Sequence, residues 1–134
     1  MALKKFLIVD DDERFTELVA KKLEKFAQCV VSNSGDDALL QFEHHLREKA
    51  PFQAVFMDIE MPKMTGHEVV EKMRGIEKQN KIAPLSAFKL VMLTAHKDVK
   101  NVSKSFFKGG ADAYIPKELI AGNFVQELEK ANII

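Results

Sequence analysis

The sequence is poor in several residue types that would point to particular classes of protein. Its 134 residues include no tryptophan, one tyrosine, one cysteine and four prolines. A single cysteine excludes an internal disulfide framework and is compatible with a reducing cytosol. Lysine plus arginine equal aspartate plus glutamate, 20 against 20, so no net charge attracts the chain to nucleic acid or to an anionic membrane. We therefore expect one soluble, cytoplasmic domain over residues 1–134 that neither binds nucleic acid directly nor inserts into a membrane.

Long hydrophobic runs are also absent. The first apolar run, residues 6–9, is too short for a signal peptide or a membrane span. Similar short runs recur at residues 29–31, 54–57, 90–93 and 113–115, and each is followed by a segment with helical spacing. Strand and helix alternating in this way predict an α/β fold, with a parallel sheet covered by helices on both faces. We expect five strands and five helices.

The same pattern predicts a fourth helix and an irregular connection. The fourth helix should begin at Asp98 and stop before Gly109. The least regular stretch runs over residues 75–88, where Gly75 and Pro84 bracket a polar, lysine-rich connection into the fourth strand. A connection of this length places partner recognition near that edge of the sheet in doubt.

Three consecutive aspartates, Asp10, Asp11 and Asp12, follow the first apolar run. Carboxylates held close together raise one another's pKa and destabilise a fold unless a divalent cation neutralises them. A second interpretation is that Asp11 or Asp12 caps the helix that begins near Glu13. Capping requires one acid rather than three, but the sequence alone leaves both interpretations open.

Other reactive side chains follow the later strands. Asp58, Thr94 and Lys117 each come directly after or at the end of an apolar run. In a parallel α/β sheet, ligands bind outside the carboxyl ends of the strands, so these residues and the aspartates should meet there. Carboxylates that hold Mg²⁺, a nucleophile, a hydroxyl and an ammonium are the groups that phosphoryl transfer requires.

Four blocks of this sequence resemble the receiver domain of two-component response regulators. They cover residues 6–11, 56–66, 91–95 and 114–117, and the likeness extends from about residue 4 to about residue 131. The resemblance implies a flavodoxin-like five-stranded parallel sheet in the order 2-1-3-4-5. It also implies either a stand-alone receiver or a piece of a longer regulator or hybrid kinase.

The resemblance assigns a role to each site residue. Asp58 would accept a phosphoryl group from the phosphohistidine of a sensor histidine kinase or a histidine phosphotransfer protein. Mg²⁺ would be bound by Asp11, Asp58 and the backbone carbonyl of Glu60, and partly through water by Asp10. Thr94 and Lys117 would bind phosphoryl oxygens. The protein would be no enzyme beyond catalysing its own phosphorylation and dephosphorylation.

The same resemblance suggests how a signal would leave the site. Phosphorylation would draw the hydroxyl of Thr94 inward and let the ring of Tyr114 turn from exposed to buried, which would reshape a partner-binding surface. Glu60 and His96 would flank the phosphoryl group and help to set its lifetime. The downstream target is not identified by the sequence.

The chain departs from the receiver pattern beside Lys117, and two other functions are alternatives. Pro116 precedes Lys117, whereas many receivers have a proline after this lysine, so a cis bond after Lys117 is not expected. A phosphatase of the haloacid dehalogenase type would use Asp10 and Asp12, but its motif has threonine or valine where this chain has Arg14. A degenerate receiver acting as a constitutive interaction module would lack a site residue, and none is missing.

Two adjacent histidines and the cysteine are further candidates for metal binding or reactivity. Adjacent histidines, His44 and His45, point in different directions on a helix and should form a solvated edge rather than a metal site. Cys29 lies in a predicted strand and should be a structural residue.

Overall fold

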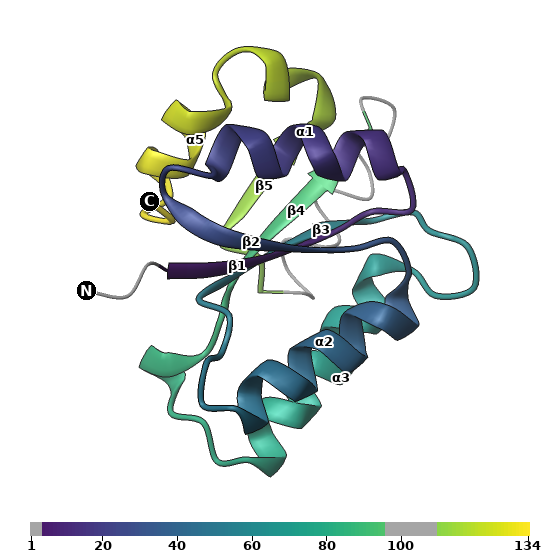
Figure 1. Cartoon of the computed structure of the whole chain (residues 1–134), viewed down its shortest axis with the longest axis vertical. Coiled ribbons are helices and arrows are strands. Elements are labelled where there is room, and N and C mark those ends of the chain that lie inside the picture. The colour runs from purple at the N-terminus through teal and green to yellow at the C-terminus, as the bar shows by residue number, and fades with distance from the viewer. Residues whose placement is uncertain (1–3, 96–109) are drawn as a thin grey trace.

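The computed structural model describes residues 4–95 and 110–134 (Figure 1). His96, Gly109 and the predicted fourth helix from Asp98 lie outside the described residues. The strands are β1 Lys4–Val9, β2 Ala27–Ser32, β3 Ala54–Asp58, β4 Lys89–Thr94 and β5 Ala113–Pro116. The α-helices are α1 Glu13–Leu23, α2 Gly35–Arg47, α3 Gly66–Gln79 and α5 Phe124–Lys130, and the short 3₁₀ helices are η1 Pro84–Ser86 and η2 Lys117–Ala121.

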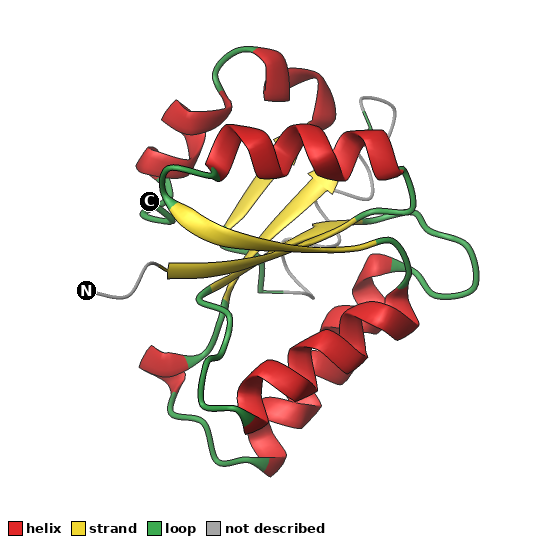
Figure 2. Ribbon diagram, in the orientation of Figure 1, coloured by secondary structure: helices red, strands yellow, loops and turns green. Residues whose placement is uncertain are grey.

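The five strands form one parallel sheet in the order β2-β1-β3-β4-β5, which confirms the predicted topology. Helices α1 and α5 cover one face of the sheet, and α2 and α3 cover the other (Figures 1 and 2). Alternate residues of each strand point to opposite faces, so β1 divides its side chains between two cores. Phe6 and Ile8 pack on the α1 side, whereas Leu7 and Val9 pack on the α2 and α3 side.

Polar side chains mark the starts of three helices. Asp12 caps α1, Ser34 caps α2, and Thr65 caps α3. Thr65 and Glu68 form a reciprocal capping box, in which each side chain accepts a hydrogen bond from the other residue's backbone N–H. These caps fix where each helix begins, directly after the loops at the carboxyl ends of the strands.

The prediction that an irregular connection begins at Gly75 is wrong. Helix α3 continues through Gly75 to Gln79, and its apolar side still packs at Met73 and Ile76. A glycine inside a helix costs only about 1 kcal/mol relative to alanine, which this packing outweighs. The irregular connection is therefore shorter than predicted and contains η1.

A polar cluster joins the last turn of α3 to the start of β4. The carboxylate of Glu77 is buried, accepts a hydrogen bond from the backbone N–H of Phe88 at 2.9 Å, and pairs with Arg74 Nη1 at 2.9 Å. Arg74 also donates to the Phe88 carbonyl at 2.9 Å and lies 3.7 Å from the centre of its ring. The backbone of Phe88 is thereby fixed at the point where β4 enters the sheet.

Nowhere in residues 4–95 and 110–134 does a helix have the length and apolar character needed to cross a bilayer.

Candidate functional site

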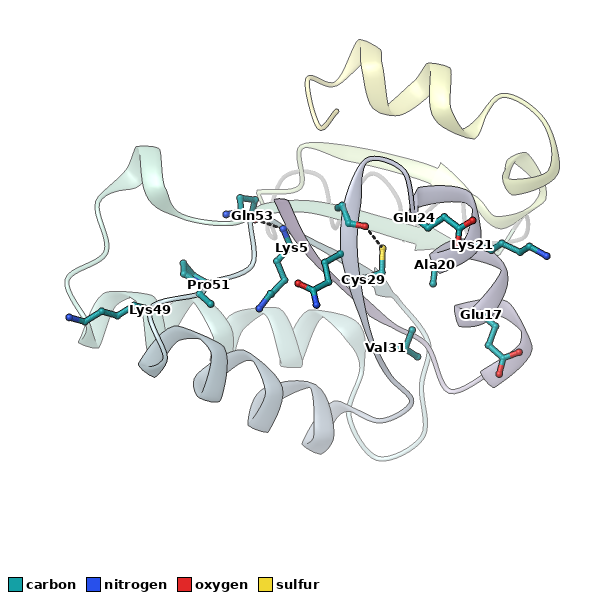
Figure 3. A pocket seen from close by; sticks show the side chains of 13 residues that line it. Lys5, Glu17, Ala20, Lys21, Glu24, Cys29, Val31, Lys49, Pro51 and Gln53 are labelled. Carbon is teal, nitrogen blue, oxygen red and sulfur yellow. Dashed lines mark hydrogen bonds between the residues drawn. The ribbon is translucent and has the colours of Figure 1, made fainter. Parts of the chain in front are cut away.

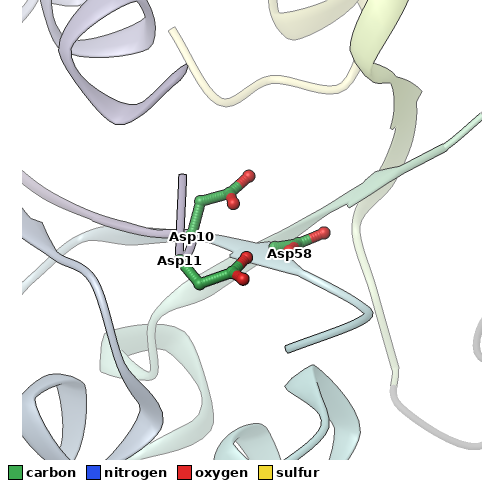
Figure 4. Close-up of side chains that lie close together, drawn as sticks. All are labelled: Asp10, Asp11 and Asp58. Carbon is green, nitrogen blue, oxygen red and sulfur yellow. The ribbon is translucent and has the colours of Figure 1, made fainter. Parts of the chain in front are cut away.

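The carboxyl ends of the strands bring the predicted acids together. Asp10 follows β1, Asp58 is the last residue of β3, and one carboxylate oxygen from each of Asp10, Asp11 and Asp58 lies within 4.8 Å of the others (Figure 4). A cavity of about 280 Å³ opens here. It is lined by Asp10, Asp11, Asp12, Asp58, Ile59, Glu60, Ala95 and Lys117.

The four acids at this edge have different surroundings. Asp10 and Asp58 are buried, at 0% and 4% exposure, whereas Asp11 is exposed. Asp12 accepts hydrogen bonds from the backbone N–H groups of Arg14 at 3.1 Å and Phe15 at 3.3 Å. The capping interpretation is therefore confirmed for Asp12, whereas Asp10 and Asp11 group with Asp58, as the interpretation as a cation site requires.

The position of Asp10 is set by its backbone and by one carboxylate oxygen. Its Oδ1 accepts a hydrogen bond from the Asp12 N–H at 2.9 Å, and its own N–H donates to the Ser32 carbonyl at 3.1 Å. The amide of Asn33 donates to the Asp10 carbonyl at 2.8 Å and to the Thr16 hydroxyl at 3.2 Å. Asn33 thus links the turn between β2 and α2 to the loop that carries the acids. No motif in the sequence predicts this role.

Lys117 reaches into the acid group. Its Nζ lies 2.7 Å from Asp10 Oδ2 and 3.1 Å from Asp58 Oδ1. The sequence predicts that the metal-free acids repel one another without a compensating charge, and it assigns Lys117 to a phosphoryl oxygen. The first part is wrong, because the ammonium of Lys117 already neutralises part of the negative charge.

The pKa values in the site reflect burial first and charge second. Burial, assisted by the negative charge of Asp10, raises the pKa of Asp58 to about 7, although Lys117 acts in the opposite direction. Burial also raises the pKa of Asp10, again against Lys117. For Lys117, burial lowers the pKa, but bonding and attraction to Asp10 and Asp58 outweigh it and the net shift is upward. A further cation beside these oxygens would therefore favour the ionised forms of both buried carboxylates.

The loop after β3 folds back closely against the site. The Gly66 N–H donates to the Ile59 carbonyl at 2.8 Å, and a Cβ on Gly66 would lie 2.2 Å from the carbonyl oxygen of Asp58. Only glycine fits at that distance, so this position is required for the backbone around Asp58. Glu60 lies within this loop, exposed at the edge of the cavity. The sequence alone does not show why glycine is needed here.

Thr94 and Tyr114 are not among the residues that line the cavity. Thr94 is buried and its hydroxyl donates to the Ala95 carbonyl at 3.1 Å. Tyr114 is half-buried and packs against the core on the α2 and α3 side. Thr94 pairs with Pro116 and Met92 pairs with Tyr114, so Thr94 and Tyr114 project from the same face of neighbouring strands.

His44, His45 and Cys29 are the remaining candidates for a metal or reactive site. The Nδ1 of His45 lies 2.8 Å from the Gln41 carbonyl, and its ring packs 4.6 Å from that of Phe52, so His45 is half-buried rather than fully solvated as predicted. His44 is exposed. Cys29 is half-buried, and burial raises its pKa to about 11, which keeps it a thiol.

A wider groove lies at the other end of the sheet (Figure 3). It has a volume of about 1040 Å³, and its lining includes Ala27 at the start of β2 and Pro51 and Gln53 just before β3. This is the amino end of the strands, whereas ligands of doubly wound sheets bind at the carboxyl end. The acidic cavity is therefore the better candidate site despite its smaller size.

Comparison with known proteins agrees with this geometry. The sequence model of the family described as "Response regulator receiver domain" matches residues 6–129. The chain is 27% identical over 137 residues to histidine kinase CKI1 of Arabidopsis thaliana, covering 94% of this chain and 12% of that protein. It is 30% identical over 124 residues to sensor protein GacS of Pseudomonas syringae pv. syringae, covering 92% of this chain and 13% of that one. The chain thus spans about an eighth of the length of these relatives.

A solved structure shows the same fold. The receiver domain of CKI1, crystallised with Mg²⁺ and BeF₃⁻, superimposes with a TM-score of 0.79 at 22% identity. The superposition covers 98% of this chain and 91% of the CKI1 domain.

Proposed function

Because the chain belongs to the family of response regulator receiver domains, we propose that Asp58 is its phosphoacceptor and that Asp10, Asp11, Glu60 and Lys117 prepare it for the reaction. The observation that carries the proposal is the position of Asp58. It ends β3, is buried, and lies within 4.8 Å of two further carboxylates and 3.1 Å from an ammonium. The family is a signalling module of two-component systems and phosphorelays, and the chemistry below is the part that we propose for this chain.

The donor in this proposal is a phosphohistidine on a sensor histidine kinase or a histidine phosphotransfer protein. A carboxylate oxygen of Asp58 forms a bond to phosphorus while the P–N bond to the histidine breaks, and the electron pair of that bond remains on the imidazole nitrogen. Negative charge spreads over the phosphoryl oxygens during this transfer, so placed cations and donors supply most of the catalysis. Lys117 lies beside the nucleophile to pair with one such oxygen.

The acid group fits a divalent cation. Its donors are all carboxylate oxygens, they converge within 4.8 Å, and they line an open cavity, which suits Mg²⁺ with several retained waters. We propose Asp11, Asp58 and the Glu60 carbonyl as direct ligands and Asp10 as a ligand partly through water. When bound, Mg²⁺ neutralises the carboxylates and the charge that develops on the phosphoryl group. The Mg²⁺ and BeF₃⁻ in the crystals of the CKI1 domain support this choice.

The output half of the proposal concerns Thr94 and Tyr114. Thr94 releases the Ala95 carbonyl and donates to a phosphoryl oxygen, and Tyr114 moves from half-buried to buried in the space that this opens. Their common face of the β4–β5 pair supports such coupling. We place the protein in the cytoplasm, where a kinase partner would meet it, and we place Glu60 beside the phosphoryl group as one determinant of its lifetime.

Neither alternative function gains support from the site. A phosphatase of the haloacid dehalogenase type needs Asp12 as its second acid, but the carboxylate of Asp12 caps α1. A degenerate receiver would lack one of the site residues, yet Asp10, Asp11, Asp58 and Lys117 are all present and lie close together.

Phosphorylation with acetyl phosphate and Mg²⁺ tests the nucleophile. We expect one acid-stable, base-labile phosphoryl group per chain, detected by intact mass, and we expect Asp58→Asn to remove it. Asp36→Asn, which changes an exposed aspartate at the start of α2, is the matched control and should be phosphorylated like wild type. A phosphopeptide that maps to Asp10, Asp11 or Asp12 would overturn the assignment.

A further inference from the structure

The ammonium of Lys117 has a third neighbour besides the two carboxylates. Its Nζ lies 4.8 Å from the centre of the Phe15 ring, while Asp10 Oδ2 is at 2.7 Å and Asp58 Oδ1 at 3.1 Å. Phe15 belongs to the first turn of α1 and is half-buried against the core on the α1 side. The ammonium therefore lies between two acids and the face of an aromatic ring.

We propose that Phe15 is a positioning residue for Lys117, an inference that rests on the function proposed above. An ammonium within about 6 Å of a ring centre is attracted to the negative face of the ring. The lysine side chain has four rotatable bonds, and its strongly hydrated ammonium can exchange contacts with the acids for contacts with water. The ring of Phe15 gives the ammonium an attractive surface in addition to the two acids.

The environment of α1 makes this contact more than ordinary packing. The N-terminus of a helix carries a partial positive charge, which is unfavourable for a nearby ammonium. Phe15 is the third residue of α1, so the ring presents a negative face near that end. An aliphatic residue there would fill the core equally well without attracting the ammonium.

The position of the ammonium affects cation binding and phosphoryl transfer in opposite directions. Lys117 and a divalent cation are attracted to the same carboxylates of Asp10 and Asp58, so a loosened ammonium leaves the acids at least as open to the cation. Phosphoryl transfer, in contrast, needs the ammonium in place when charge develops. Loss of the ring should slow phosphorylation without weakening Mg²⁺ binding, whereas general damage to the site would impair both.

The test compares Phe15→Leu with Phe26→Leu. Both phenylalanines are half-buried and pack against the same core, but Phe26 follows the other end of α1. Phosphorylation is measured with acetyl phosphate at saturating Mg²⁺, Mg²⁺ affinity by titration of backbone amide NMR shifts, and the ring contact by the upfield shift of the Lys117 ε-methylene protons.

We expect Phe15→Leu to phosphorylate about two- to fivefold more slowly, the range of one cation–π contact. Its Lys117 shift should be lost and its Mg²⁺ dissociation constant should stay the same or fall. Phe15→Tyr, which keeps the ring, and Phe26→Leu should behave like wild type. If Phe15→Leu does not fold, Phe15→Met repeats the test with a flexible side chain that has no ring.

Two results would overturn the inference. One is an unchanged phosphorylation rate and Lys117 shift in Phe15→Leu, and the other is a loss of Mg²⁺ affinity that accompanies the slower rate. If wild type itself takes no phosphoryl group, the proposed function fails. In that case the mobility of the Lys117 ε-methylene group, compared by NMR relaxation between wild type and Phe15→Leu, decides whether the ring positions the ammonium.

Discussion

Asp58 is subject to two opposing requirements. As the proposed nucleophile it must be ionised, yet burial and the neighbouring charge of Asp10 favour its protonated form and raise its pKa to about 7. Lys117 opposes that shift only in part. A second cation near the same oxygens makes the ionised form the stable one, which links the reactivity of the residue to metal binding.

The raised pKa predicts a particular dependence of stability on pH in the absence of metal. Between about pH 4 and about pH 7, the folded protein holds a proton on Asp58 that the unfolded chain has lost, so the free energy of unfolding falls as the pH rises through that window. Asp58→Asn lacks this term. Its stability relative to wild type should therefore increase by about 1 kcal/mol or more from pH 4 to pH 7 and level off above, with Asp10 still pairing Lys117.

Urea unfolding of both proteins in EDTA at several pH values measures this difference. Asp36→Asn serves as the control, because its carboxylate is exposed and lies on α2. A difference between Asp58→Asn and wild type that stays constant across the window would show that the carboxylate of Asp58 is not strained in the folded state.

Site residues could be named from the sequence, but their surroundings could not. Asp58 and Lys117 stand directly after apolar runs, and this position alone predicts that they meet at one edge of a sheet. The pairing of Lys117 with Asp10, and the exposure of Asp11 beside buried Asp10, depend on how the chain turns into α1. That turn is set by hydrogen bonds around Asp12, which no spacing of residue types reveals.

Helix α3 contains two glycines whose surroundings and structural roles differ. Gly66 begins the helix and has no room for a Cβ beside the Asp58 carbonyl, whereas Gly75 has no atom within 4 Å of the position a Cβ would take. In the sequence both look like breaks in a helix. The distinction requires knowledge of what lies across from each residue, which is a tertiary property.

Alanine substitution at these two positions should have opposite effects on stability. Gly66→Ala should destabilise the fold by about 1–3 kcal/mol, because the new methyl group pushes against the backbone of Asp58, and should slow phosphorylation as well. Gly75→Ala should stabilise the fold by about 0.5–1 kcal/mol, because alanine loses less conformational entropy in a helix. Thermal or urea unfolding of the two variants measures both values. A stable, fully active Gly66→Ala would contradict the close approach of α3 to β3.

For the whole molecule, the order of the strands follows from the alternation of strands and helices only with help from the family resemblance. Alternation predicts a parallel sheet, but many strand orders satisfy it. The order β2-β1-β3-β4-β5 places the ends of β1 and β3 side by side, and with them Asp10 and Asp58. The fourth helix, predicted from Asp98, is the part of that pattern outside the described residues.

Binding of Mg²⁺ should be visible in the stability of the entire domain. A ligand that binds only the folded chain raises the free energy of unfolding by about 1.4 kcal/mol for each tenfold increase in concentration above its dissociation constant. We therefore expect the melting temperature of wild type to rise steadily with Mg²⁺ and to return to its starting value with EDTA. Calorimetry or a thermal melt followed by circular dichroism measures this response.

Asp11→Asn is the informative partner in that experiment. Asp11 is exposed, so the variant should melt close to wild type in EDTA, yet it should lose most of the Mg²⁺ response because a ligand is gone. Asp36→Asn should keep the full response. An undiminished response in Asp11→Asn would move the metal away from this acid.

The polar cluster at the start of β4 has a consequence for signalling at its far end. Glu77 and Arg74 hold both backbone groups of Phe88, so β4 cannot slide along α3 without breaking its hydrogen bonds to these two side chains. In the switch proposed above, a rearrangement at Thr94 therefore bends the last residues of the strand about a stationary base. Movement in this proposal is confined to the end of β4 beside the acid group, and the register between β3, β4 and β5 is the constant frame against which a partner would detect it.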